Sequence, residues 1–322
     1  MSTAPAKARR PGIIEANKRS AHWVLRLGGL SPWALLKRTL ADARRDDVMG
    51  RAAQLSFYFM LALFPLISFA CSVAAFAVSN DRQFSQQLLQ SLKPTMPDAA
   101  FTLMKSVIAQ VLQNPSHARL GVSLLLTVWS ASYGVEAQID GVNVAFDVRE
   151  HRSWWKRRLL ALGMTVVLEA VVLLAFSTIF WGTRIADLLA GKSGTQGLLA
   201  WLWPFVQWGF LILCLSGAIA LVYRLAPNLR TQSLVAVLPG TLVAVVGWIL
   251  AALAFRFYID VFFTSYTNMY GSLAAAIALL LWLYLTAAVL LLGAEVNSEI
   301  RWAASGSGSG DAQEALKENR AR

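Results

Sequence analysis

The chain has 322 residues, of which 57% are hydrophobic and only 15% are charged, and its mean hydropathy is +0.52. This composition is typical of a protein with several membrane spans and excludes an ordinary soluble enzyme. The net charge of +11 would suggest nucleic-acid binding in a soluble protein, but in a membrane protein it first reflects orientation in the bilayer. We therefore expect membrane lipids, and not nucleic acid, as partners.

The cysteines and histidines do not form a recognisable metal or redox motif. Cys71 and Cys214 both fall in apolar runs, and the three histidines are scattered along the chain. No HExxH or paired CxxC motif occurs in the sequence. We therefore expect no disulfide, no metal site, no cofactor and no catalytic residue, which argues against an enzyme.

The N-terminal residues 1–30 are basic and irregular, which indicates a cytoplasmic arm. Ser31 and Pro32 then form a helix start, an N-cap followed by proline at the first helical position. The apolar residues that follow share one helical face: Trp33, Leu36, Leu40 and Ala43. This pattern predicts a short helix that either lies on the membrane surface or packs on the cytoplasmic end of a helix bundle.

Six apolar stretches are long enough to cross a bilayer core of about 30 Å, which needs about 20 helical residues. They are residues 52–79, 120–146, 159–183, 198–223, 233–257 and 270–300. The last stretch has no charge between Ser272 and Ala294, and its small residues would let neighbouring helices come close. We predict an all-α fold, a polytopic membrane helix bundle over residues 31–302, with a flexible cytoplasmic tail at 303–322.

Residues 80–118 are polar and too long for a tight turn. Helical spacing on either side of the central prolines predicts an extramembrane helical hairpin between spans one and two. Inside the spans, Pro65 and the pair Pro239-Gly240 predict helix breaks, because proline removes a backbone hydrogen bond. Such breaks can frame a transporter site, but prolines are also ordinary in membrane helices.

Lys and Arg are unevenly divided between the two sides that six spans would define. The N-terminal arm, the loops after spans two and four, and the tail carry 22 of these residues, whereas the other side carries 7. Because basic loops tend to stay in the cytoplasm, this division predicts that both termini are cytoplasmic.

The second half of span two carries polar residues at steps of four, three and four, which places them on one helical face. They are Glu136, Asp140, Asn143 and Asp147. Glu169 lies ten residues into span three, at about mid-bilayer. Ionisable groups at this depth usually face a cavity or a partner, so Glu136, Asp140, Asn143 and Glu169 form a candidate interior polar site. Alternatively, span two ends near Tyr133 and its stripe is solvated, and Glu169 is a protonated carboxyl bonded to another helix.

Arg51, Gln54 and Glu295 all fall near the expected cytoplasmic face. A structural Arg51–Glu295 ion pair is one interpretation of this group, and a gate is the other. The basic loop after span two supplies candidate contacts for anionic headgroups: Arg152, Lys156, Arg157 and Arg158. The same four residues also fit a loop that determines topology.

Several stretches resemble the YihY/BrkB family of bacterial inner-membrane proteins, once mislabelled as ribonuclease BN. The resemblance covers about Leu35 to Arg301 and rests on AAQLSFYFMLALFPL, WSASYGVEAQIDGVNVAFDVREHRSWWKRRLLAL, YRLAPN, PGTLVAVVGW, FRFY and YGSLAAAIALLLWLYLTAAVLLLGAEVN. It implies a six-span protein of the bacterial inner membrane, in a family associated with virulence by name and with transport of envelope components.

Three classes of function follow from these observations. The first, which we favour, is a transporter or flippase-like protein for a lipid, an envelope precursor or another amphiphile, because it needs interior polar groups and mobile helices. The second is a non-transporting membrane scaffold for envelope assembly. The third, a ribonuclease, is disfavoured, because the acidic stripe lies on or beside a span with no histidine near it.

Overall fold

The computed structural model describes residues 27–62, 117–193, 196–229, 232–270 and 273–304. Within these ranges the chain is helical and contains no strand, which confirms the all-α prediction for this part of the protein. The elements are η1 (Leu27–Gly29), α2 (Pro32–Arg45), a helix over 48–62, α6 (His117–Ala145), α7 (Trp154–Ser193), α8 (Gln196–Leu225), α9 (Leu234–Tyr270) and α10 (Leu273–Ala304). Pro65, nearly all of the predicted hairpin, most of the N-terminal arm and the tail after residue 304 lie outside the described residues.

Four helices of the described chain are long and apolar enough to cross a membrane. They are Trp154–Ala175, Leu202–Leu225, Leu234–Val261 and Leu273–Ala304, and they correspond to predicted spans three to six. The helix over 48–62 and α6 lie where spans one and two were expected, but they are not among these four helices. The count of six spans therefore stays a prediction.

The helix ends confirm some local signals and correct others. Ser31 caps α2 as predicted, because its hydroxyl accepts a hydrogen bond of 3.2 Å from the backbone N–H of Ala34. Residues 258–269, expected to form a loop, continue α9 to Tyr270. The physical reason is that this aromatic segment contains no glycine or proline before Gly271, so nothing local ends the helix.

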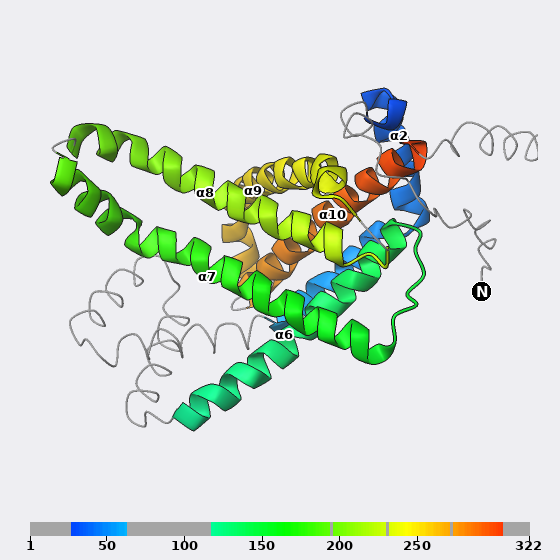
Figure 1. Cartoon of the computed structure of the whole chain (residues 1–322), viewed down its shortest axis with the longest axis horizontal. Coiled ribbons are helices and arrows are strands. Elements are labelled where there is room, and N and C mark those ends of the chain that lie inside the picture. The colour runs from blue at the N-terminus through cyan, green and yellow to red at the C-terminus, as the bar shows by residue number, and fades with distance from the viewer. Residues whose placement is uncertain (1–26, 63–116, 194–195, 230–231, 271–272, 305–322) are drawn as a thin grey trace, which may run out of the picture.

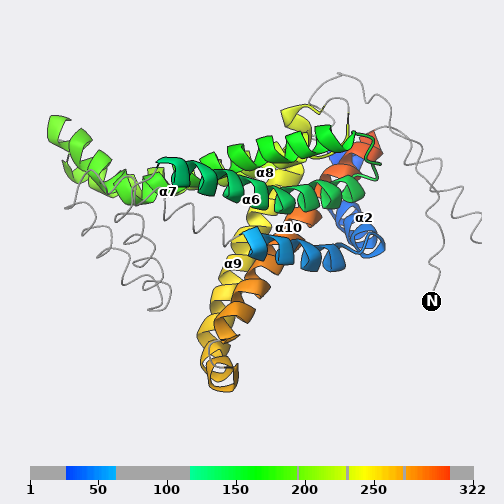
Figure 2. The ribbon, with the colours of Figure 1, turned by 90° about the horizontal axis from the view of Figure 1, so that it is seen from below.

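The helices share one end, which we call the polar end. The start of α7, the ends of α6, α8 and α10, the start of α9, and α2 all lie there (Figure 1). Away from the polar end, the α9–α10 pair leaves the layer formed by α6, α7 and α8 (Figure 2). The segments predicted to share the cytoplasmic side are therefore together in space, although which side of a membrane they occupy stays a prediction.

The antiparallel helices α9 and α10 cross at two glycines, Gly240 and Gly293, both buried. A Cβ atom added to Gly293 would lie 2.7 Å from the carbonyl oxygen of Gly240, so only glycine allows this approach. Asn297, one turn beyond Gly293 and 2% exposed, accepts a hydrogen bond of 2.7 Å from the Gly240 N–H and donates one of 3.1 Å to the Val237 carbonyl. Tyr223 of α8 is fully buried beside them and donates to the Leu290 carbonyl.

This crossing gives the small residues of the last span the close-packing role that was predicted for them. The α9 helix itself is continuous through Pro239 and Gly240. Pro239, the sixth residue of the helix, removes one intrahelical hydrogen bond, and Asn297 bonds to the Gly240 N–H and the Val237 carbonyl beside it. A hinge at these two residues stays a prediction.

Candidate functional site

The acidic stripe of α6 faces the first turns of α7, where two arginines meet it. Glu136 pairs with Arg157 at 3.1 Å and with Arg158 at 3.0 Å, and Arg157 also pairs with Asp140 at 2.8 Å. Helix α6 ends and α7 begins at the loop of residues 146–153, and the two helices pack antiparallel. The last turns of α6 therefore lie against the first turns of α7. The carboxylates of the stripe are therefore neither turned toward lipid without a partner nor fully hydrated, because guanidinium groups neutralise their charge.

Arg158 is the most enclosed cation of this network, with 3% of its surface exposed. Its guanidinium lies 4.2 Å from the ring centre of Trp129 and 4.1 Å from that of Tyr133. It also donates to the Trp129 carbonyl at 3.2 Å. A planar guanidinium suits this position, because it can stack on aromatic faces and keep hydrogen bonds in its plane.

Asn143 belongs to a second cluster, which joins the α6–α7 loop to the α8–α9 loop. Its amide donates to Glu150 at 2.9 Å, and its side-chain oxygen accepts from the backbone N–H of Asn228 at 2.8 Å. Arg152 donates to the last carbonyls of α8 and the turn after it, those of Leu225, Ala226 and Pro227, at 2.9–3.3 Å. A cation at a helix C-terminus is favourable, because carbonyl groups there lack intrahelical partners.

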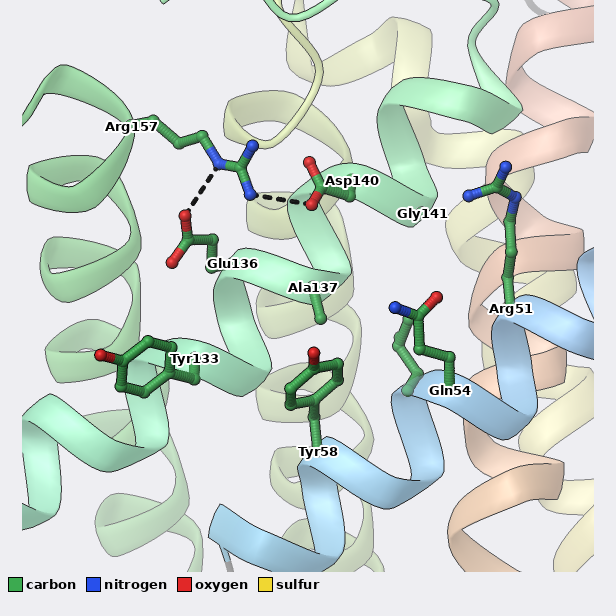
Figure 3. A pocket seen from close by; sticks show the side chains of 10 residues that line it. Arg51, Gln54, Tyr58, Tyr133, Glu136, Ala137, Asp140, Gly141 and Arg157 are labelled. Atoms are coloured by element: carbon green, nitrogen blue, oxygen red, sulfur yellow. Dashed lines mark hydrogen bonds and ion pairs between the residues drawn. The ribbon is translucent and has the colours of Figure 1, made fainter. Parts of the chain in front are cut away.

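A polar cavity of about 120 Å³ lies between the helix over 48–62 and α6, and Figure 3 shows its lining. The helix over 48–62 supplies Arg51, Gln54, Leu55 and Tyr58. The opposite wall consists of Tyr133, Glu136, Ala137, Asp140 and Gly141 of α6, with Arg157 of α7 beside them. The structure thus brings part of the predicted gate and part of the predicted interior site to one place. Arg51 is held there by a hydrogen bond of 2.9 Å from its Nε atom to the Asp46 carbonyl.

Three other predicted residues lie elsewhere. Glu169 is on α7, 12 residues or about 18 Å beyond Arg157, and its buried Oε1 atom has no hydrogen-bond partner among the described residues. Glu295 is buried on α10, with 1% of its surface exposed, and its pairing with Arg51 stays a prediction. Lys156 is exposed, unlike Arg158 beside it.

Several residues that build the polar end were missed by sequence reasoning. They are Tyr58, Tyr133, Glu150, Asn228 and Asn297. Asn297 had a usable signal, since it follows Gly293 by four residues and therefore lies on the same close-packed helical face. Asn228 had no comparable signal, because its role depends on contact between two loops distant in sequence.

The helices and this cluster define an integral membrane protein whose transmembrane helices gather charged and amide side chains at one end. The chain belongs to the family described as virulence factor BrkB, whose model matches residues 39–317.

Known relatives agree with this assignment. The chain is 30% identical over 266 residues to a Bacillus subtilis protein, YfkH, whose name calls it ribonuclease-like; the match covers 82% of this chain and 94% of that protein. It is 30% identical to a UPF0761 membrane protein of Alkalilimnicola ehrlichii, covering 80% of this chain and 56% of that longer relative. It is 26% identical to a UPF0761 membrane protein of Vibrio vulnificus, covering 83% and 82%. No solved structure matches the chain.

Proposed function

We propose that this protein moves an amphiphilic lipid or envelope precursor across the bacterial inner membrane, or gates its access, in the manner of a transporter or flippase. The observation that carries the proposal is the polar cavity between the helix over 48–62 and α6. Its two walls belong to different helices, so relative movement of the helices would open or close it. The polar part of the cargo would occupy this cavity.

The charges around the cavity suit a polar or anionic headgroup. Arg51 and Gln54 stand on one wall, and Arg157 stands on the other beside the two carboxylates it pairs with (Figure 3). With Arg158 included, three guanidinium groups oppose two carboxylates, so the cluster keeps a net positive charge. A headgroup phosphate could therefore approach Arg51 without breaking the ion pairs that Arg157 makes with Glu136 and Asp140.

Glu169 supports a path deeper into the membrane. It lies about three turns from the cavity on α7, in a helix apolar enough to span the bilayer. A carboxyl group at such depth costs about 2.5–3.5 kcal/mol on insertion scales, and such residues commonly mark a proton or substrate route. The cytoplasmic location of the polar end is proposed on the uneven division of Lys and Arg.

A scaffold is the second candidate, and the internal ion pairs favour it. Arg152, Arg157 and Arg158 already contact protein groups, so part of the predicted headgroup surface is used to hold loops and helices together. A nuclease is disfavoured on the same ground, because the carboxylates of α6 neutralise arginines in place of binding metal ions. We therefore propose no enzymatic step.

Reconstitution tests the proposal. Purified protein in vesicles with a fluorescent phosphatidylglycerol in both leaflets should make inner-leaflet label accessible to an added quencher. Arg51→Gln should slow this movement about tenfold, since a hydrogen bond to a charged group contributes about 1.5–3 kcal/mol and 1.4 kcal/mol is a factor of ten. The matched control is Arg256→Gln, because Arg256 is 82% exposed and pairs only loosely with Asp260 at 3.8 Å.

An experiment in cells distinguishes a transporter from a scaffold. Glu169→Gln and Asp140→Asn should abolish the cellular phenotype of a transporter while leaving insertion and folding intact. If both variants keep the phenotype and no tested lipid or envelope precursor moves in vesicles, the scaffold becomes the better assignment.

A further inference from the structure

Helix α2 has two different apolar faces, and only one of them is covered by the described protein. Leu35, Thr39 and Ala43 are buried, and Leu35 packs against Val296 and Ile300 near the end of α10. The second face, which we call the exposed stripe, consists of Trp33, Leu36 and Leu40, which are 64%, 47% and 47% exposed. The packed face thus differs from the one predicted from the sequence, of which only Ala43 is buried.

A row of basic side chains borders the exposed stripe on the side away from α10. It begins with Lys37 and Arg44, beside the stripe, and ends with Arg45, about 80–100° further around the helix; all three are exposed. Lys37 reaches back over the ring of Trp33, with its Nζ atom 5.2 Å from the ring centre. In helical order, the surface of α2 therefore passes from the packed face to the exposed stripe and then to the basic row. This order matches a helix whose apolar side enters the acyl boundary while its cations stay among phosphates.

The location of α2 places these faces beside the end of a membrane-spanning helix. Val296 and Ile300, its contacts on α10, follow directly after the uncharged run of that membrane-spanning helix. Figure 1 shows α2 across the C-terminal end of α10. Arg38 lies 5.8 Å from the ring centre of Trp302, so an aromatic residue marks the same level. Trp154 and Trp155, 56% and 74% exposed, begin α7 at this end of the molecule.

We propose that α2 lies in the headgroup layer of the bilayer that its own chain spans and binds anionic phospholipids there. The exposed stripe would enter the acyl boundary, and Lys37, Arg44 and Arg45 would contact phosphates. Two observations indicate that a lipid surface covers the exposed stripe. Helix α2 packs against the end of a membrane-spanning helix, and the charge of its basic row is complementary to an anionic leaflet. The inference does not depend on whether the protein transports anything.

Spin labels can test the depth of the helix directly. The full chain with Cys71→Ser and Cys214→Ser would carry one new cysteine, Leu36→Cys or Leu40→Cys, labelled in nanodiscs containing phosphatidylglycerol. The matched control is Ala41→Cys, because Ala41 is exposed but points about 100° away from Leu40. Labels at 36 and 40 should be relaxed more by oxygen than by a water-soluble nickel complex, and the label at 41 should show the opposite preference.

Equal and high accessibility to the nickel complex at all three positions would overturn the proposal. Dipolar broadening between labels at 36 or 40 would overturn it too, because a second copy of the chain would then cover the stripe.

The lipid charge is tested separately. Retention of phosphatidylglycerol through purification should fall several-fold in the triple variant Lys37→Gln, Arg44→Gln, Arg45→Gln, and should stay unchanged in Arg256→Gln. Unchanged retention in the triple variant, with equal label depth in phosphatidylcholine alone, would overturn the assignment to anionic headgroups.

Discussion

The crossing of α9 and α10 predicts that alanine is destabilising at Gly293, whereas alanine should be tolerated at Gly217 on α8. In Gly293→Ala the new methyl group would lie 2.7 Å from the Gly240 carbonyl oxygen and 2.9 Å from the Cβ of Ala244, and also too close to the Tyr223 hydroxyl. Backbone and Cβ atoms cannot turn away, so the two helices must separate. In Gly217→Ala on α8 the methyl group meets nothing within 4 Å.

The magnitude follows from what separation would break. Overpacking of this kind costs about 1–3 kcal/mol. Separation also weakens the two hydrogen bonds of Asn297 and that of Tyr223, and interhelical hydrogen bonds in membranes average about 0.6 kcal/mol each. Gly293→Ala should therefore lower the free energy of unfolding by about 3–5 kcal/mol. Gly217→Ala should be neutral or stabilising by up to about 1 kcal/mol, the helix propensity of alanine over glycine.

The assay is the fraction of detergent-solubilised protein that stays monodisperse after heating, measured across a temperature series for the wild type and both variants. Gly293→Ala should move the midpoint down and Gly217→Ala should leave it or raise it. A Gly293→Ala protein as stable as the wild type, or two variants that shift alike, would refute the close approach at this crossing.

Three further predictions concern orientation and charge. Reporter fusions after Arg152 should report the cytoplasm and fusions after Lys192 the outside, and the reverse pattern would invert the assigned orientation. Arg158→Met should lower folded yield, measured by size exclusion, because it leaves Glu136 with one arginine in place of two and removes the aromatic contacts; an unchanged yield would contradict this. Glu295→Lys should lower the free energy of unfolding by up to about 3–5 kcal/mol, and therefore the folded yield, and adding Arg51→Glu should partly restore both. A double variant less stable than the sum of the two single changes would show that Arg51 and Glu295 are not partners.

Local signals accounted for much of the fold. The Ser31 cap and the apolar runs of α7 to α10 depend on residues near one another in sequence, so their helices could be predicted. The face shared by Glu136 and Asp140 could also be predicted, because helical spacing alone determines it. Their partners could not, since Arg157 and Arg158 fit a topology determinant equally well until the antiparallel packing of α6 and α7 is known. The Asn143–Asn228 contact escaped prediction for the same reason: it joins the last turn of α6 to a loop residue 85 positions further along the chain.

The contacts between the α6–α7 loop and the α8–α9 loop have a mechanical consequence. Arg152 reaches three carbonyls of the other loop region, and Asn228 bonds to both Asn143 and the Arg149 carbonyl. These five hydrogen bonds fasten the last turns of α6 and α8 and the loop that leads into α7 into one unit at the polar end, which has little freedom to shear. The helix over 48–62 shares none of them and faces that unit across the cavity at Arg51 and Gln54. If the proposed transport opens the cavity, a motion that preserves the five bonds would separate the helix over 48–62 from α6, and the cavity lies at that boundary.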